Sequence, residues 1–193
     1  MKDGLPLVSV VTPTYNQAQF LAETIESVLG QDYSHVEHIV INDGSTDATE
    51  EILRGFNGRL QWYSQSNQGQ TAAINRGFLL ASGEIVTWLN SDDTYLYRHT
   101  LSEVVEAFQR RPEADVIYGD AVLISEDNRL LKVLCVPAFG YEWLLRGCRL
   151  IQPASFFRRR VIESELPDPK INIVMDYEYW LRLGLFFLFR HVP

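Results

Sequence analysis

A short apolar, β-branched run that ends abruptly in acids constrains this chain most. The run IVTWL at 85–89 reads as a buried strand, and Asn90, Ser91, Asp92 and Asp93 follow it directly. The segment 39–47, IVINDGSTD, repeats the pattern. Because open α/β sheets bind ligands at the carboxyl ends of their parallel strands, both acid clusters are expected at one edge of a sheet. A divalent cation with phosphate oxygens suits such carboxylates, although either cluster alone would also fit a turn.

Strands alternate with helices through the first half of the chain, which predicts an α/β fold. The expected form is a mostly parallel central sheet with helices on both faces and a small antiparallel element in the second half. Strands are predicted at 8–12, 36–41, 60–64, 85–89, 116–118 and 154–157. Helices are predicted after Asn16 and at 47–56, 71–81, 101–109, 141–146 and 176–185. A hairpin is predicted over 121–136, with its turn at Glu126, Asp127 and Asn128.

Length and charge limit the classes of protein that remain. The 193 residues suit one domain, 1–193, in which about 1–95 bind a ligand and about 96–193 complete the site. A formal net charge of −8 and the lack of any basic run argue against nucleic acid as a partner. Cys135 and Cys148 have no metal-type spacing, so packed free thiols are expected, with a disulfide left open.

The chain ends give a provisional location. No apolar signal region follows Met1, and the apolar run at 185–189 is too short to span a bilayer, so a cytoplasmic protein is expected. The last residues read as a helix end followed by a strand, which predicts that the native chain continues beyond Pro193. Exposed Phe side chains near this end would then be a result of truncation.

Two strand ends carry candidate binding residues. After the first strand, Pro13 stiffens the backbone and Tyr15 can shape a nucleoside pocket that Asn16 orients, or Asn16 simply caps the next helix. Asp43 can accept a hydrogen bond from a base or a ribose hydroxyl, or it is only a turn former beside Gly44. Ser45 and Asp47 are expected to cap the following helix.

Two further segments can complete a site. In residues 67–77, Gly69 lets the backbone approach a ligand just before a helix N-terminus, which favours phosphate, although turn geometry and close packing also explain Gly69 and Gly77. Asp176 starts a later helix, where it either caps the helix or serves as a general base, with Glu178 pointing away from it. No phosphate-loop or dinucleotide fingerprint occurs, which argues against nucleotide hydrolases and nicotinamide enzymes.

Taken in order, the motifs at 8–16, 40–47, 67–77 and 90–93 resemble the family 2 glycosyltransferases of the GT-A fold. This resemblance implies an inverting transfer of a sugar from a nucleotide diphosphate-sugar to a hydroxyl acceptor, assisted by Mg²⁺ or Mn²⁺. It makes 1–95 the half that binds the nucleotide-sugar and 96–193 the acceptor-side half. UDP-sugars are the default donors, and a saccharide or lipid-linked acceptor points to polysaccharide or glycolipid synthesis, with peripheral association at the inner face of a membrane left open.

The resemblance also implies roles for individual residues. Asp176 is the catalytic base, Asp92 holds the metal, and Asp93 and Gln152 lie on the acceptor side. The expected donor-binding residues are Thr12, Pro13, Tyr15, Asn16, Asp43, Gly69, Asn75, Asn90, Ser91 and Asp92.

Two departures from the family pattern keep alternatives open. Asn90 stands where the Asp-x-Asp motif often has its first Asp, and Met175 stands where the family frequently carries Glu. A non-catalytic module that binds nucleotide-sugars is therefore one alternative. A sugar nucleotidyltransferase is another, disfavoured because residues 12–16 contain neither glycine nor a basic residue. The sugar, base, acceptor, linkage and oligomeric state are not determined by these motifs.

Overall fold

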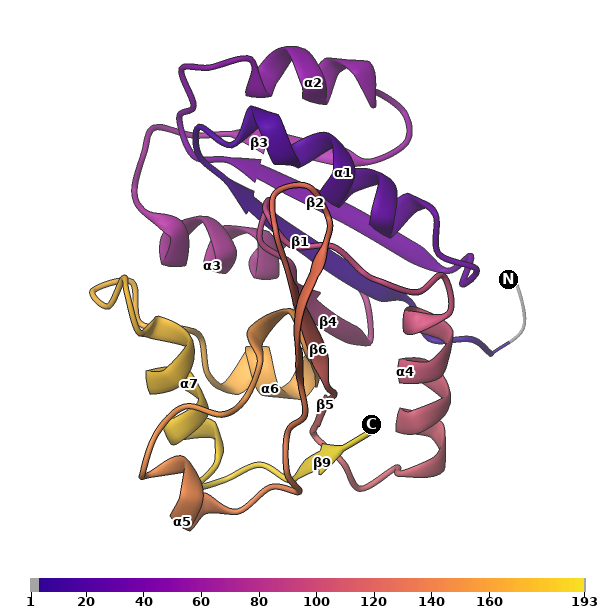
Figure 1. Cartoon of the computed structure of the whole chain (residues 1–193), viewed down its shortest axis with the longest axis vertical. Helices are drawn as coiled ribbons and strands as arrows, with labels where there is room; N and C mark the ends of the chain where they lie inside the picture. The colour runs from indigo at the N-terminus through magenta and orange to yellow at the C-terminus, as the bar shows by residue number, and fades with distance from the viewer. Residues whose placement is uncertain (1–3, 193) are drawn as a thin grey trace.

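A seven-stranded sheet forms the centre of the molecule in the computed structural model, which describes residues 4–192. Its order is β3-β2-β1-β4-β8-β5-β9 (Figure 1). Only β8 runs antiparallel to its neighbours, so the expected mostly parallel sheet is confirmed. The strands are β1 Val8–Thr14, β2 Val36–Asn42, β3 Gln61–Ser64, β4 Ile85–Trp88, β5 Val116–Tyr118, β8 Ser155–Arg158 and β9 Phe189–His191.

Helices cover both faces of this sheet, as the alternation predicted (Figure 1). In β1, Val8 and Val10 pack with the helices of one face, whereas Val11 packs with those of the other, because successive side chains of a strand point to opposite sides. The first face carries α1 Ala18–Leu29, α2 Thr49–Gly55 and α4 Thr100–Arg110. The second face carries α3 Gln70–Leu80, α6 Arg159–Ser164 and α7 Met175–Leu183. The short α5 Tyr141–Leu144 and the 3₁₀ helix η1 Gln152–Ala154 lie near the second face.

The expected antiparallel element is the hairpin of β6 Ala121–Ile124 and β7 Leu130–Leu134. Asn128 has a positive φ of 60° at its turn, a conformation that Asn tolerates well. The Asn128 Nδ2 donates to Glu23 Oε1 of α1 at 2.7 Å. The tip of the hairpin therefore contacts α1 (Figure 1).

Some boundaries and environments differ from the sequence expectations. Strand β1 continues through Pro13 to Thr14. This is tolerated because β1 pairs with β4 only as far as Val11, so Pro13 needs to pair with β2 alone. The cysteines are free, but the prediction that they are packed was wrong, because Cys135 and Cys148 lie exposed outside the helices and strands. Among residues 4–192, no helix has both the length and the apolar character needed to cross a membrane.

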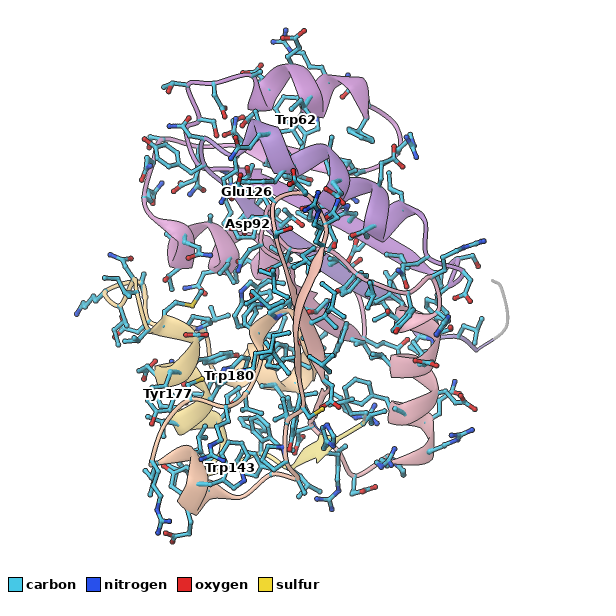
Figure 2. All side chains as sticks on the ribbon, in the orientation of Figure 1. Trp62, Asp92, Glu126, Trp143, Tyr177 and Trp180 are labelled. Atoms are coloured by element: carbon cyan, nitrogen blue, oxygen red, sulfur yellow. The ribbon has the colours of Figure 1, made fainter. Side chains whose placement is uncertain are left out.

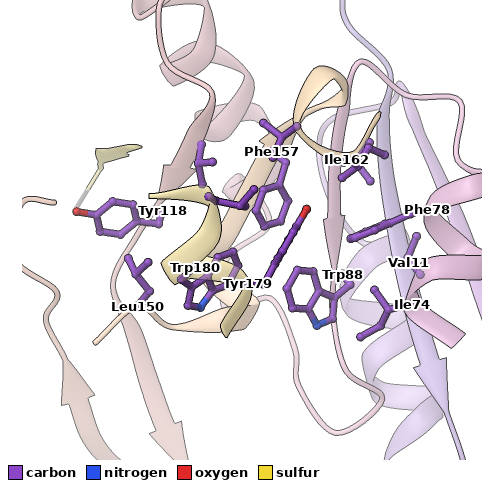
Figure 3. Close-up of a cluster of buried hydrophobic side chains, with 14 of the residues drawn as sticks. Val11, Ile74, Phe78, Trp88, Tyr118, Leu150, Phe157, Ile162, Tyr179 and Trp180 are labelled. Carbon is purple, nitrogen blue, oxygen red and sulfur yellow. The ribbon is translucent and has the colours of Figure 1, made fainter. Parts of the chain in front are cut away.

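An aromatic cluster fixes α7 against the sheet (Figure 3). The indole of Trp88, the last residue of β4, stacks on Phe157 at 5.7 Å and on Trp180 at 5.6 Å between ring centroids. Such pairs add about 0.5–1.5 kcal/mol each beyond the area they bury. The middle of α7 is thereby held at a defined place relative to the end of β4.

Helix α3 lies unusually close to β1. A Cβ atom added at Gly77 would lie 2.2 Å from Val11 Cγ1, so no larger residue fits there unless Val11 or the helix shifts. This bears out the interpretation of Gly77 as a close-packing residue. The same close contact sets where the N-terminus of α3 meets the carboxyl ends of the strands.

Buried His38 makes stability depend on pH. Its Nε2 lies 2.9 Å from Thr12 Oγ1, its Nδ1 has no partner within residues 4–192, and burial lowers its pKa to about 3. Because the unfolded chain takes up a proton near pH 6.5 and the folded chain does not, lowering the pH from 7 to 5 should cost about 2 kcal/mol through this residue. Between pH 7 and pH 5, we expect the free energy of unfolding of His38→Gln to fall by about 2 kcal/mol less than that of wild type. Chemical denaturation at both pH values measures this difference. If wild type and His38→Gln lose the same free energy of unfolding over this interval, His38 is not the cause of the pH dependence.

Candidate active site

A pocket of about 360 Å³ lies at the carboxyl ends of β1, β2 and β4. Both predicted acid clusters contribute to it, so the expectation that they share one edge of the sheet is confirmed. The N-terminus of α3 supplies the facing wall. The lining residues are Pro13, Thr14, Tyr15, Gln17, Asp43, Asn67, Gly69, Gln70, Ala73, Asn90 and Asp92.

Asp43 is the buried acid of this pocket and is 2% exposed. Its carboxylate accepts hydrogen bonds from Gln65 Nε2 at 2.6 Å, the Gln68 amide at 3.0 Å and the Gly69 amide at 2.8 Å. The Gln68 amide also lies 3.2 Å from the second carboxylate oxygen, so each oxygen of Asp43 receives two contacts. Asp43 therefore anchors the loop at 65–69 and lines the pocket.

Glycines let that loop approach Asp43. Gly69 has a φ of +90°, which a residue with a side chain rarely adopts, and its amide points at the carboxylate. At Gly44, φ is +81° and an added Cβ would lie 2.9 Å from the Asn67 amide nitrogen. The turn after β2 and the loop before α3 thus pack backbone against backbone.

In the loop after β1, the side chains of Tyr15 and Asn16 have different contacts. Tyr15 lines the pocket and is 48% exposed. Asn16 does not line the pocket, and its Oδ1 accepts from the Thr46 amide at 2.8 Å. The expected capping of α1 by Asn16 is wrong, because the Ala18 amide donates to Asp47 Oδ2 at 3.0 Å. Asn16 instead ties the first loop to the second.

Asp47 joins the ends of two helices. Besides its contact with Ala18, its Oδ1 accepts from the Thr49 amide at 3.1 Å at the start of α2. Asp47 therefore binds the first amide of the following helix, as its predicted capping role requires, from the residue before the N-cap position Ala48. Ser45, also predicted as a cap, instead accepts from the Asn16 amide at 3.0 Å through its Oγ.

The loop after β4 presents Asp92 to solvent. Asp92 is exposed, lines the pocket, and receives no hydrogen bond within residues 4–192 (Figure 2). Its neighbours are fixed to α1, because Thr24 Oγ1 donates to the carbonyls of Ser91 and Asp93, each at 2.9 Å. Ser91 is buried, bonds Gln17 through its hydroxyl and does not line the pocket, so it supports the loop that carries Asp92.

Asn90 connects both halves of the chain. Its Oδ1 accepts from Gln70 Nε2 at 2.8 Å, and its Nδ2 donates to Gln152 Oε1 at 2.9 Å and to Asp93 Oδ2 at 3.2 Å. Burial raises the pKa of Asp93 to about 6, the negative charge of Asp92 adds to this effect, and the hydrogen bond from Asn90 opposes it. The predicted acceptor-side residues Asp93 and Gln152 thus both accept hydrogen bonds from the side-chain amide of Asn90.

Besides Asn16 and Ser91, two further predicted donor-binding residues, Thr12 and Asn75, lie away from the pocket lining. Thr12 is buried in β1 against His38. Asn75 donates to the Pro167 carbonyl at 2.8 Å and so holds the segment before α7. Sequence reasoning missed Gln17, Asn67, Ala73, Gln70 and Thr14 as lining residues. The position of Gln70 directly after Gly69, at a helix N-terminus, was the available signal for it.

Asp176 is half-buried at the start of α7 and is not among the residues that line the pocket. Its Oδ1 accepts from the Tyr177 amide at 2.7 Å, and its other oxygen receives no hydrogen bond within the described part of the chain. Glu178 pairs with Arg182 at 2.5 Å one turn later. Figure 2 shows Tyr177 and Trp180 on α7, apart from Asp92 on the loop after β4.

The segment before α7 nevertheless borders the pocket wall. Thr71 Oγ1 of α3 donates to the Ile171 carbonyl at 2.9 Å. Asn172 Oδ1 lies 3.3 Å from the position of a Cβ at Gly69, which itself lines the pocket. Asp176 therefore follows, four residues later, Asn172, which lies beside the pocket lining.

A mostly parallel sheet with helices on both faces and acids at its carboxyl edge places the chain among the GT-A α/β proteins. Residues 9–166 match the family model described as Glycosyl transferase family 2. The chain belongs to this family. The resemblance identified from the sequence motifs is therefore confirmed.

Similar proteins agree with this assignment. An uncharacterized glycosyltransferase of Rickettsia felis is 31% identical over 92% of this chain and 31% of its own length. The putative teichuronic acid biosynthesis glycosyltransferase TuaG of Bacillus subtilis is 30% identical over 95% of this chain and 74% of its own. The chain thus spans about a third of the length of the Rickettsia felis protein.

Solved structures show the same fold. TarS of S. aureus, residues 1–349, has a TM-score of 0.78 at 20% identity and covers 96% of this chain and 58% of its own. The mannosyltransferase PcManGT of Pyrobaculum calidifontis, solved with GDP-Man and Mn²⁺, has a TM-score of 0.73 at 20% identity, covering 99% of this chain and 56% of its own. TarS has also been solved with UDP-GlcNAc.

Proposed function

We propose that this chain is the catalytic domain of an inverting glycosyltransferase that moves a sugar from a nucleotide diphosphate-sugar to a hydroxyl acceptor. One observation carries the proposal: a buried acid, Asp43, and an exposed acid, Asp92, line the same pocket beside the N-terminus of α3. Membership of glycosyl transferase family 2 supports it. So do the nucleotide-sugars named in the structures of TarS and PcManGT.

The lining residues suit the parts of such a donor. The half-exposed ring of Tyr15 and the carboxylate of Asp43 would contact the nucleoside, because the ring offers an apolar face and the carboxylate an acceptor. The diphosphate would lie toward Gly69 and Gln70, where the N-terminus of α3 favours negative charge. UDP-sugars are the proposed default donors.

The acids present fit a divalent cation that arrives with the nucleotide. Within residues 4–192, no group of three or more His, Cys, Asp or Glu side chains could hold a metal by itself. Mg²⁺ is commonly bound by one or two carboxylates together with substrate phosphates, and exposed Asp92 offers one. Asp92 would hold Mg²⁺ or Mn²⁺, which when bound neutralises charge on the nucleoside diphosphate leaving group.

The second half of the chain would serve the acceptor. Asp176 would remove the proton of the acceptor hydroxyl as its oxygen attacks the anomeric carbon from the face opposite the leaving group, so the configuration inverts. Gln152 and Asp93 would lie on the acceptor side. We propose a saccharide or lipid-linked acceptor in polysaccharide or glycolipid synthesis, in the cytoplasm or peripherally at the inner face of a membrane. The teichuronic acid pathway in the name of TuaG supports a polymer product.

Calorimetric titration with UDP, GDP and dTDP, each with and without Mn²⁺, tests the donor site. We expect one nucleotide to bind with an affinity that Mn²⁺ raises at least about tenfold, and Asp92→Ala to lose that increase because it removes the exposed carboxylate. Glu163→Ala, an exposed acid on α6, is the matched control and should behave as wild type.

The outcomes separate the candidate functions. If no nucleotide binds under any condition, or if Asp92→Ala keeps the Mn²⁺ effect, the proposed donor site is wrong. If a nucleotide-sugar binds but no nucleotide is released with a broad panel of acceptors, the chain is a non-catalytic binding module.

A further inference from the structure

The side-chain amide of Asn90 is almost fully used by the protein itself. Both of its N–H groups have partners, Gln152 Oε1 at 2.9 Å and Asp93 Oδ2 at 3.2 Å, and its oxygen accepts from Gln70 Nε2 at 2.8 Å. An amide has two donors and two acceptor lone pairs, so only one lone pair remains. The NH₂ of Asn90 therefore has no hydrogen left for a ribose or a metal-bound water.

The orientation of Gln152 is fixed independently of Asn90. Gln152 is 8% exposed, and its Nε2 donates to the Trp88 carbonyl at 2.6 Å. A carbonyl can only accept, so the NH₂ of Gln152 must face Trp88 and its Oε1 must face residue 90. Position 90 consequently needs a donor.

An aspartate cannot meet this requirement. A carboxylate at position 90 would place acceptor against acceptor at Gln152 Oε1, and also at Asp93 Oδ2 when Asp93 is ionised, while the contact with Gln70 would survive. Turning the Gln152 amide would satisfy position 90 but would set its oxygen against the Trp88 carbonyl. Leaving a buried polar group unpaired costs more than a hydrogen bond contributes.

We propose that Asn90 is a positioning residue that must be an amide in this chain. It locks Gln152 of the second half to Gln70 at the pocket wall, and it leaves Asp92 as the exposed acid of the loop. On this account, restoring the Asp that the family motif often carries at this position weakens the site. The binding part of the argument rests on the proposed function, whereas the packing part does not.

A double-mutant cycle tests the coupling through thermal unfolding. We expect Asn90→Asp to lower Tm by about 5–10 °C, since two partly buried hydrogen bonds become contacts between acceptors. On the background Gln152→Met, which removes the opposing oxygen, the same change should lower Tm by less than half as much. Asn67→Asp is the matched control. It adds the same charge to the same pocket, but Asn67 uses its Oδ1 as an acceptor for the Gly69 amide at 3.2 Å, a contact that Asp retains, so its Tm should shift by less than about 2 °C.

The nucleotide affinity of the folded variant is a second measurement. If Asn90 only stabilised the fold, this affinity would not decrease in the folded variant. With Mn²⁺ at a temperature where both proteins are folded, Asn90→Asp should bind the preferred nucleotide about tenfold more weakly despite its extra carboxylate. An unchanged Tm, additive Tm shifts in the cycle, or an equal or tighter nucleotide affinity would overturn the proposal. If Asn90→Asp does not fold, recovery of a folded chain in the double variant supports the coupling, and its failure to fold overturns it. If wild type binds no nucleotide, the proposed function fails while the Tm cycle still decides the coupling.

Discussion

Replacing Asp176 by Asn should reduce sugar transfer by about 10²- to 10⁴-fold and leave donor affinity unchanged, because a positioned general base contributes about that factor. The change is nearly isosteric, and the remaining oxygen can still accept from the Tyr177 amide at 2.7 Å. Trp180 and Tyr179 stay packed, so α7 should keep its place. The variant thus removes the basic oxygen and little else.

Single-turnover release of nucleoside diphosphate, with calorimetric titration of the same samples, measures both quantities. Glu178→Gln is the matched control on the same helix, because Glu178 pairs with Arg182 instead of serving the acceptor. We expect it to keep transfer within about threefold of wild type. An Asp176→Asn protein with near wild-type transfer would reject Asp176 as the base and leave the rest of the donor site untouched.

Replacing Asp43 by Asn should weaken nucleotide binding by more than about 100-fold and lower the free energy of unfolding by about 2–3 kcal/mol. The carboxylate accepts from Gln65, from the Gln68 amide and from the Gly69 amide. An Asn side chain would turn an NH₂ toward one of these donors and remove the charge that strengthens the rest. The loop that forms one wall of the pocket would lose its anchor.

Calorimetry and chemical denaturation of the same protein check the two effects. Gln65→Ala is the informative control, because it removes one donor and leaves both backbone amides on Asp43. We expect it to cost less than half as much in both measurements. If Asp43→Asn binds nucleotide like wild type, Asp43 neither anchors the loop nor contacts the nucleoside.

Much of the fold could be predicted from the sequence because its signals are local. β-branched runs and helical spacing gave the strands and helices of the first half, and Asn128 correctly indicated the hairpin turn. Acids directly after strands predicted the ligand edge, because the carboxyl ends of parallel strands must lie together. The place of β8, antiparallel between β4 and β5, had no local signal, since the partners of a short strand are chosen by tertiary packing.

What the sequence determined by itself is the class of this protein: an α/β chain of glycosyl transferase family 2 with Asp43 and Asp92 at one edge. Only the tertiary structure decided how the side chains there are used. It showed that Asp43 is held by backbone amides of a later loop, that Asp47 caps a helix that begins 29 residues before it, and that Asn90 meets Gln152 across 62 residues. Backbone donors and distant amides leave no pattern along the chain, because any residue carries an N–H and contact depends on where the folded elements bring it.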